Sequence, residues 1–206
     1  MNFPILSSLI LLPTIGALFL LFSKDKNSNT GKYVALFTSF VNFLISIYLW
    51  YLFDPSTSTF QFVENREWLK GFVNYKVGVD GISILFIILT TLITPLCIIS
   101  VNNTIKVRLR DFLIAILVME SLMIGVFCSL DLVVFYLFFE AGLIPMFLII
   151  GIWGGERRVY SAFKFFLYTL LGSVLMLVAI ISIYWIAGTT DIAVSYTHLR
   201  AHETTS

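Results

Sequence analysis

The sequence predicts an all-α polytopic membrane protein with six transmembrane helices and the amino terminus on the outer side. Composition is the first reason: of 206 residues, 59% are hydrophobic and 12% are charged, and the mean hydropathy is +0.96. Soluble domains are nearer ~45–50% apolar and ~25% charged. The second reason is the length of the apolar runs, and the third is the placement of lysine and arginine between them. These observations exclude a water-soluble domain.

Six apolar runs are long enough to cross a bilayer, which takes about 20 residues in a helix. The first is expected to be a retained helix rather than a signal peptide, because its lysines follow the apolar stretch. The first three runs contain no charged residue, whereas the last three contain Glu120, Glu140 and Lys164 in that order. The runs lie at residues 3–22, 33–53, 82–101, 112–130, 132–152 and 159–187.

The positive charges between the runs predict the direction of the chain. The loops at 23–32, 102–111 and 154–158 carry eight lysine and arginine residues, and the 54–80 loop carries three. Because short loops rich in these residues stay in the cytoplasm, the amino terminus is expected outside.

Residues 1–194 are expected to form one membrane domain, with the outer loop 54–80 as its only sizeable extramembrane piece. Strand-favouring residues at 72–77 predict a short hairpin on the outer face. Residues 195–206 are abruptly polar and resemble translated sequencing-adapter read-through, so they are expected to be a non-native tail. The natural chain is then expected to continue beyond about position 194.

Several classes of function are excluded by residue inventory. The net charge of +1 is too small to produce an electrostatic field that attracts nucleic acid. Cys97 and Cys128 lie in apolar runs, and His198 and His202 lie in the tail, so the chain has no ligand set for an iron–sulfur cluster or haem. No cofactor or metal is expected in this chain. An intramembrane hydrolase fails because the runs hold no Ser/His pair.

Two acidic residues are predicted to sit halfway through the membrane. Glu120 and Glu140 each lie ten residues from Leu130, on either side of a turn near Asp131. At about 1.5 Å per residue both are about 15 Å deep in a core about 30 Å thick. An acid there costs about 2.5–3.5 kcal/mol on insertion scales, which favours a functional group that exchanges a proton. The alternative is a carboxyl that only hydrogen-bonds a neighbouring helix.

Two further residues belong to this hypothesis. Pro145 frees the carbonyl group of Ala141 beside Glu140, and such a break can hold water. Lys164 is predicted about 10 Å inside the cytoplasmic face. There it either lowers the proton affinity of a glutamate or extends its side chain to the membrane interface. Asp131 and Asp80 are most simply helix caps.

The motifs in this order resemble those of one family. They are Gly78-Val-Asp-Gly-Ile-Ser83, the run from Asp131 to Glu140, Leu143-Ile-Pro-Met146, Gly151-Ile-Trp-Gly-Gly155 and Ala162-Phe-Lys-Phe-Phe-Leu-Tyr168. The family is the antiporter-like membrane chain of NADH:quinone oxidoreductase, called chain M in bacteria and NADH dehydrogenase subunit 4 in mitochondrial complex I.

The resemblance implies an antiporter-like inverted-repeat fold, of which this sequence holds the first part. It implies a proton path through Glu140, Glu120 and Lys164, as the fifth-, fourth- and sixth-helix residues. It also implies location in a bacterial or mitochondrial inner membrane, with other complex I membrane subunits and the lipid bilayer as partners. NAD, FMN, iron–sulfur clusters and quinone are then expected in partner subunits. The alternatives are a sodium/proton antiporter subunit, a membrane-bound hydrogenase subunit and a passive scaffold.

Overall fold

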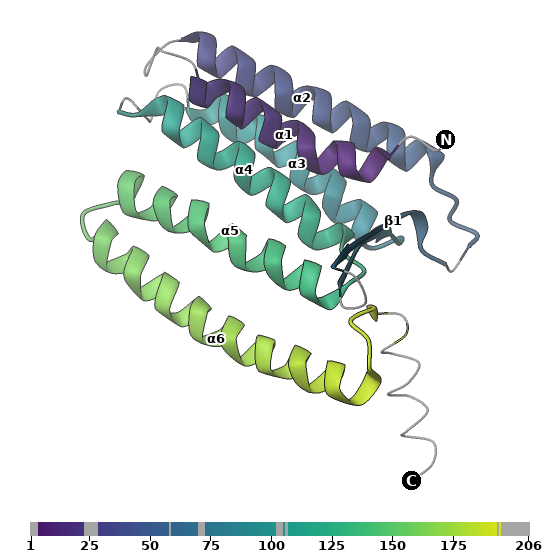
Figure 1. Ribbon diagram of the computed structural model, residues 1–206. Coiled ribbons are helices and arrows are strands. Elements are labelled where there is room, and N and C mark those ends of the chain that lie inside the picture. Colours follow the sequence, from purple (N-terminus) through teal and green to yellow (C-terminus); the bar gives the residue numbers. More distant parts are fainter. Residues whose placement is uncertain are drawn as a thin grey trace.

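The computed structural model describes most of the chain as six long helices and one β-hairpin (Figure 1). The described residues are 4–22, 29–57, 59–69, 73–101, 105, 107–192 and 194. The expected tail at 195–206 lies outside them.

All six helices are long and apolar enough to cross a membrane, with at least 18 residues each. Their apolar residues face every side rather than one stripe, as expected for helices surrounded by lipid and other helices. The prediction of six transmembrane helices is therefore confirmed. The helices are α1 (Ile5–Phe22), α2 (Asn29–Leu52), α3 (Ser83–Ser100), α4 (Leu109–Cys128), α5 (Leu132–Trp153) and α6 (Arg158–Ala187).

The predicted hairpin is present between α2 and α3. Strand β1 (Gln61–Leu69) pairs antiparallel with β2 (Val73–Val79), and β2 covers most of the stretch predicted as strand. The hairpin is fastened to the first turn of α1 by Glu64, whose carboxylate accepts a hydrogen bond from Leu6 N at 2.8 Å and one from the Ser7 hydroxyl. An acidic side chain on the free amides of a helix N-terminus stabilises that end.

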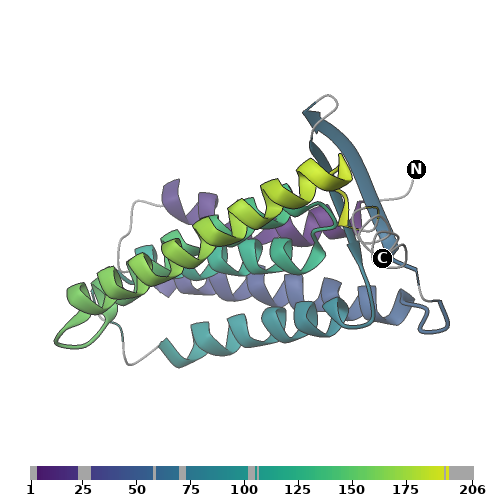
Figure 2. The same cartoon turned by 90° about the horizontal axis from the view of Figure 1, so that it is seen from below.

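Further backbone pairing joins the hairpin to the ends of α4, α5 and α6. Leu130 N donates to Lys76 O at 2.9 Å, Leu132 N donates to Thr190 O at 2.9 Å, and Ile192 N donates to Leu130 O at 3.0 Å. Lys76 also forms an ion pair with Asp191. The hairpin thus lies across one end of the helices (Figure 2), and isolated bridges join Val77 to Ser129 and Asp131 to Asp191.

The helices form a bundle of four with a pair at its side. In Figure 1, α1, α2, α3 and α4 lie together, and α5 and α6 follow one another away from α4. Helix α4 is the centre of the bundle, since 56% of its span is buried, against 39% for α1, 33% for α3 and 28% for α2. The core therefore sits around α4, where Leu113, Leu117 and Ile124 are fully buried.

Candidate functional site

Glu120 occupies the interior of the bundle, where α4 meets α2. Its side chain is 2% exposed, and Asn42 of α2, which is wholly buried, donates from Nδ2 to Glu120 Oε1 at 2.9 Å. The second carboxyl oxygen, Oε2, is buried and has no hydrogen-bond partner among the described residues. A buried polar atom without a partner is rare in a folded protein and marks a position to explain.

Other polar side chains lie beside this carboxyl in the bundle. Ser121 bonds with Thr14 of α1 at 2.7 Å and donates to the Ile10 carbonyl oxygen. Ser46 of α2 bonds with Thr91 of α3 at 2.7 Å. Hydroxyl and amide groups thus link all four helices of the bundle, in a region that apolar side chains otherwise fill.

Glu120 also lines a groove of about 300 Å³ between α3 and α4. The wall is mostly apolar, and its polar groups belong to Thr90, Thr94, Cys97 and Glu120. Cys97 is exposed, so one wall of the groove is reached from the surface of the chain. Glu120 therefore contributes to the wall of this groove, although its side chain is 2% exposed.

Glu140 lies in a different seam from Glu120. It is half-buried on α5, and its Oε2 atom is buried without a hydrogen-bond partner in the described part of the chain. Phe147, two helical turns farther on the same face, packs its ring at 5.5 Å from Phe163 and from Phe166 of α6. Glu140 therefore faces the junction of α5 with α6. Glu120 lies elsewhere, at the contact of α4 with α2, where Asn42 donates a hydrogen bond to it.

Lys164 is exposed on α6. Within the described ranges it forms no ion pair, and the two pairs present are Lys76 with Asp191 and Arg110 with Asp111. The structure therefore does not bring Lys164 into contact with either glutamate, and its role stays a prediction.

The two aspartates interpreted as caps have that role in the structure. Asp131 Oδ1 accepts from Val133 N at 2.9 Å and from Val134 N at 3.2 Å, and its Oδ2 accepts from the Thr190 hydroxyl at 2.5 Å. Asp80 Oδ1 accepts from Ser83 N at 2.7 Å. Both oxygens of Asp131 accept hydrogen bonds that hold the fold together, so Asp131 is not a candidate proton carrier.

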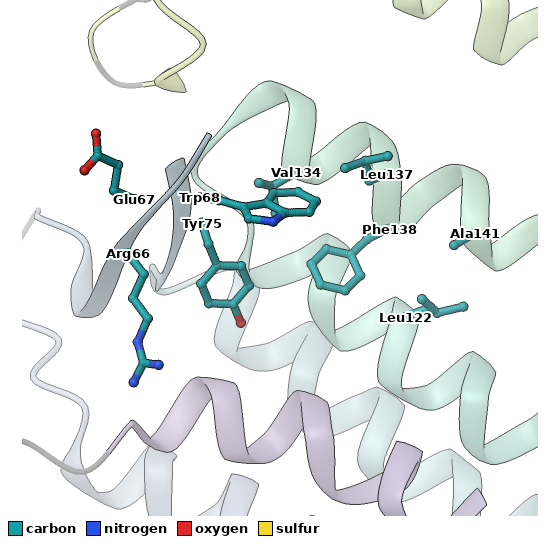
Figure 3. A pocket seen from close by; sticks show the side chains of 9 residues that line it. All are labelled: Arg66, Glu67, Trp68, Tyr75, Leu122, Val134, Leu137, Phe138 and Ala141. Carbon is teal, nitrogen blue, oxygen red and sulfur yellow. The ribbon is translucent and has the colours of Figure 1, made fainter. Parts of the chain in front are cut away.

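A second cavity, of about 630 Å³, lies where the hairpin covers the carboxyl end of α4 and the amino end of α5 (Figure 3). Its walls are mainly apolar, and the rings of Trp68, Tyr75 and Phe138 line it with Leu122 and Ala141. Burial raises the pKa of the Tyr75 phenol, and a hydrogen bond with Ser7 opposes this shift. The sequence did not point to this cavity, because it forms between segments far apart in the chain.

The described residues hold no group of three or more His, Cys, Asp and Glu side chains suited to a metal ion. Sequence reasoning followed the charged residues and missed Asn42, which is the hydrogen-bond donor to Glu120. A signal was available: Ser39, Asn42 and Ser46 recur every three or four residues in an apolar run, which places them on one helix face. All three are wholly buried.

Comparisons with known proteins agree with this arrangement. A family model described as NADH:quinone oxidoreductase/Mrp antiporter, TM, matches residues 129–204. NADH-quinone oxidoreductase subunit M of Rhodobacter capsulatus is 61% identical over 82% of the chain and 32% of its own length. NADH-ubiquinone oxidoreductase chain 4 of Marchantia polymorpha is 45% identical over 93% of the chain and 39% of its own length.

The structural comparison gives the same family. A chain of respiratory complex I from Thermus thermophilus with bound NADH superposes with a TM-score of 0.79 and 30% identity, over 94% of this chain and 39% of that one. The chain thus spans about a third to two fifths of the length of the relatives it matches. Helices, motifs and relatives lead to one conclusion: this integral membrane protein belongs to the antiporter-like family of NADH-quinone oxidoreductase subunit M and NADH-ubiquinone oxidoreductase chain 4.

Proposed function

We propose that the chain is part of the proton-translocating membrane subunit of an NADH:quinone oxidoreductase, which couples the oxidation of NADH by quinone to proton pumping. The partners are other membrane subunits of that complex, and NAD, FMN, iron–sulfur clusters and quinone are bound by partner subunits. The relatives at 61% and 45% identity support the complex, because both are named as its subunits. The chain contributes a route for protons rather than a redox centre.

The observation that carries the proposal is a pair of carboxyl groups within membrane-spanning helices, each with one buried oxygen that lacks a partner among the described residues. These atoms are Oε2 of Glu120 and Oε2 of Glu140. By contrast, both oxygens of Asp131 accept hydrogen bonds, one set at the start of α5 and one from the Thr190 hydroxyl. An oxygen held away from lipid but without a partner is available to bind a proton or a water molecule.

We propose Glu140 as the principal proton carrier, with Glu120 and Lys164 in the same path. Pro145 lies five residues after Glu140 inside α5, so one backbone hydrogen bond of that helix is missing next to the carboxyl. A charge change in a partner subunit then shifts the proton affinity of Glu140, because neighbouring charges act strongly in a medium of low dielectric constant. The orientation proposed has the hairpin and the start of α1 on the outer side.

The experiment compares Glu140→Gln with Glu156→Gln in membrane vesicles that contain the assembled complex. Glutamine keeps the size and hydrogen-bonding capacity of the side chain but carries no proton. The matched control removes a carboxyl from the exposed turn between α5 and α6, where Glu156 lies. NADH-driven acidification, NADH oxidation and the amount of assembled complex are measured together.

Glu140→Gln is expected to lose most of its acidification at normal assembly, and Glu156→Gln is expected to keep it. Full acidification in the Glu140 variant would refute the carrier role. A variant that assembles poorly, but pumps normally for each complex assembled, would favour a passive scaffold. Acidification that requires sodium ions would favour the antiporter alternative, which the family model also covers.

A further inference from the structure

Two side chains at the centre of the α1–α4 bundle share one hydrogen bond, and each keeps one oxygen without a partner in the residues that the structure describes. Asn42 is 0% exposed and Glu120 is 2% exposed. Asn42 Nδ2 donates to Glu120 Oε1 at 2.9 Å. The atoms left over are Asn42 Oδ1 and Glu120 Oε2, both buried and both without a partner in the described part of the chain.

Both of these atoms are hydrogen-bond acceptors when Glu120 is ionised. The carboxylate then offers no donor, so the amide oxygen of Asn42 stays unsatisfied. A proton on Oε2 supplies the missing O–H donor. A carboxylic acid and a carboxamide can then pair through two hydrogen bonds, one from N–H to Oε1 and one from O–H to Oδ1. One hydrogen atom satisfies both orphaned oxygens.

The surroundings of the pair also favour the neutral acid. Helices α1 and α3 contain no charged residue, and the single charged residue of α2, Lys32, lies ten positions before Asn42. Strand β2 packs against α4, but its Lys76 is paired with Asp191. The charged residue within α5 is Glu140, which has the same sign. Cys97 is the other titratable group that lines the groove beside Glu120.

We propose that Asn42 is a positioning residue that holds Glu120 as a neutral acid, with the carboxyl proton on Oε2 donated to Asn42 Oδ1. When Glu120 ionises, the O–H bond breaks and the proton passes to a water molecule in the groove between α3 and α4. The bond to Oδ1 is lost with it, and the bond from Nδ2 remains. The carboxyl of Glu120 thus holds a proton that it can release, and it is not a fixed negative charge.

The role of the Asn42–Glu120 pair in proton transport rests on the proposed function. The hydrogen-bonded pair itself can be tested without that function. The test is infrared spectroscopy of the full 206-residue chain in lipid nanodiscs at pH 7. The carbonyl stretch of a protonated carboxyl is separate from that of a carboxylate, and it moves to higher wavenumber when the group loses hydrogen bonds. Glu120→Gln identifies the band of Glu120 by removing it.

The variant Asn42→Leu keeps the approximate volume of the side chain and removes the amide. The band of Glu120 is expected to move to higher wavenumber in this variant. Asn42→Gln keeps a carboxamide on a longer stem and is expected to move the band part of the way. Ser39→Ala is the matched control on the same face of α2, because the Ser39 hydroxyl donates within its own helix, to Leu36 O at 3.1 Å. The band of Glu120 is expected to stay in place in this variant.

Two results would overturn the proposal: no protonated Glu120 band in the unmodified chain, or a band that stays in place when Asn42 is replaced. Circular dichroism checks that each variant is folded, and the glutamine variant decides the matter in the same way if the leucine variant does not fold. The outcome is separable from the proposed function, since normal pumping by Glu140→Gln would refute that function and leave the Glu120 band unchanged.

Discussion

The acidic residues within or beside the helices have different roles, and the number of hydrogen bonds that each carboxyl group accepts distinguishes these roles. Both oxygens of Asp131 have partners, one of Glu120 does, and Oε2 of Glu140 has none in the described residues. Asp131 is therefore a structural acid. The cap was predictable from sequence, because an aspartate directly before an apolar run is typical of a helix start.

Replacing Asp131 with alanine is expected to destabilise the chain without removing a proton carrier. It removes the acceptor for two amides at the start of α5 and for the Thr190 hydroxyl, and loss of an N-cap alone costs about 0.5–2 kcal/mol. Thermal unfolding in nanodiscs measures the loss. Asp111→Ala, in the first turn of α4 and without a cap bond, is the control. Equal unfolding temperatures for the two variants would contradict the assignment.

The partner of Glu120 was not predictable in the same way. Depth along a helix follows from residue counting, so the sequence indicated that Glu120 lies inside the membrane. Which neighbouring helix supplies the donor depends on how the helices pack. Because these helices are apolar on every face, their sequences have no hydrophobic periodicity that would indicate which face meets which neighbour. Asn42 is identified only when α2 and α4 are placed side by side.

At the scale of the elements, α4 and α5 pack closely because a glycine lies at their contact. A Cβ atom added at Gly125 would be 2.5 Å from the ring of Phe138. A Cβ added at Gly142 of α5 would meet nothing within 4 Å. The two glycines thus have different surroundings: Gly125 permits a close approach of two helices, and Gly142 has room for a side chain.

We therefore expect Gly125→Ala and Gly142→Ala to have opposite effects on stability. The added methyl group at 125 forces Phe138 or the helices to move, at a cost of about 1–3 kcal/mol. At 142 alanine fits and favours the helix, by roughly 0.5–1 kcal/mol. Unfolding temperatures of both variants in nanodiscs provide the measurement, and a stabilising Gly125→Ala would show that the α4–α5 seam is packed differently.

The local sequence pattern predicts one strand of the hairpin and not the other. Strand β2 follows a run of strand-favouring residues, and this half was predicted. Strand β1 carries Glu64, Arg66 and Glu67, which read as an ordinary polar loop. Its strand conformation is supported by contacts that are distant in sequence, above all the bond of Glu64 to the first turn of α1.

At the scale of the whole molecule, the number and order of the helices were predictable because the bilayer requires runs of a set length. The grouping into a bundle of four and an outlying pair was not, because the periodicity of these helices is weak. The position of the hairpin over the ends of α4, α5 and α6 likewise depends on segments far apart in the chain. The direction of the chain across the membrane stays a prediction from the positive charges.

That direction has a direct test with single cysteines and a maleimide that does not cross membranes. Ser56→Cys lies in the exposed loop between α2 and β1, and Glu156→Cys lies in the exposed turn between α5 and α6. In cells with an intact inner membrane, the first is expected to be labelled from outside and the second only after the membrane is opened. The reverse pattern would contradict the proposed orientation.

The central claim is that the half-buried carboxyl of Glu140, within a membrane-spanning helix, carries protons. The most direct measurement is the number of protons translocated per NADH oxidised in vesicles with Glu140→Asp and with Glu140→Gln. Aspartate keeps an acid on a shorter stem and is expected to retain part of the ratio, whereas glutamine lowers it. Equal ratios in the two variants and the unmodified complex would contradict the claim.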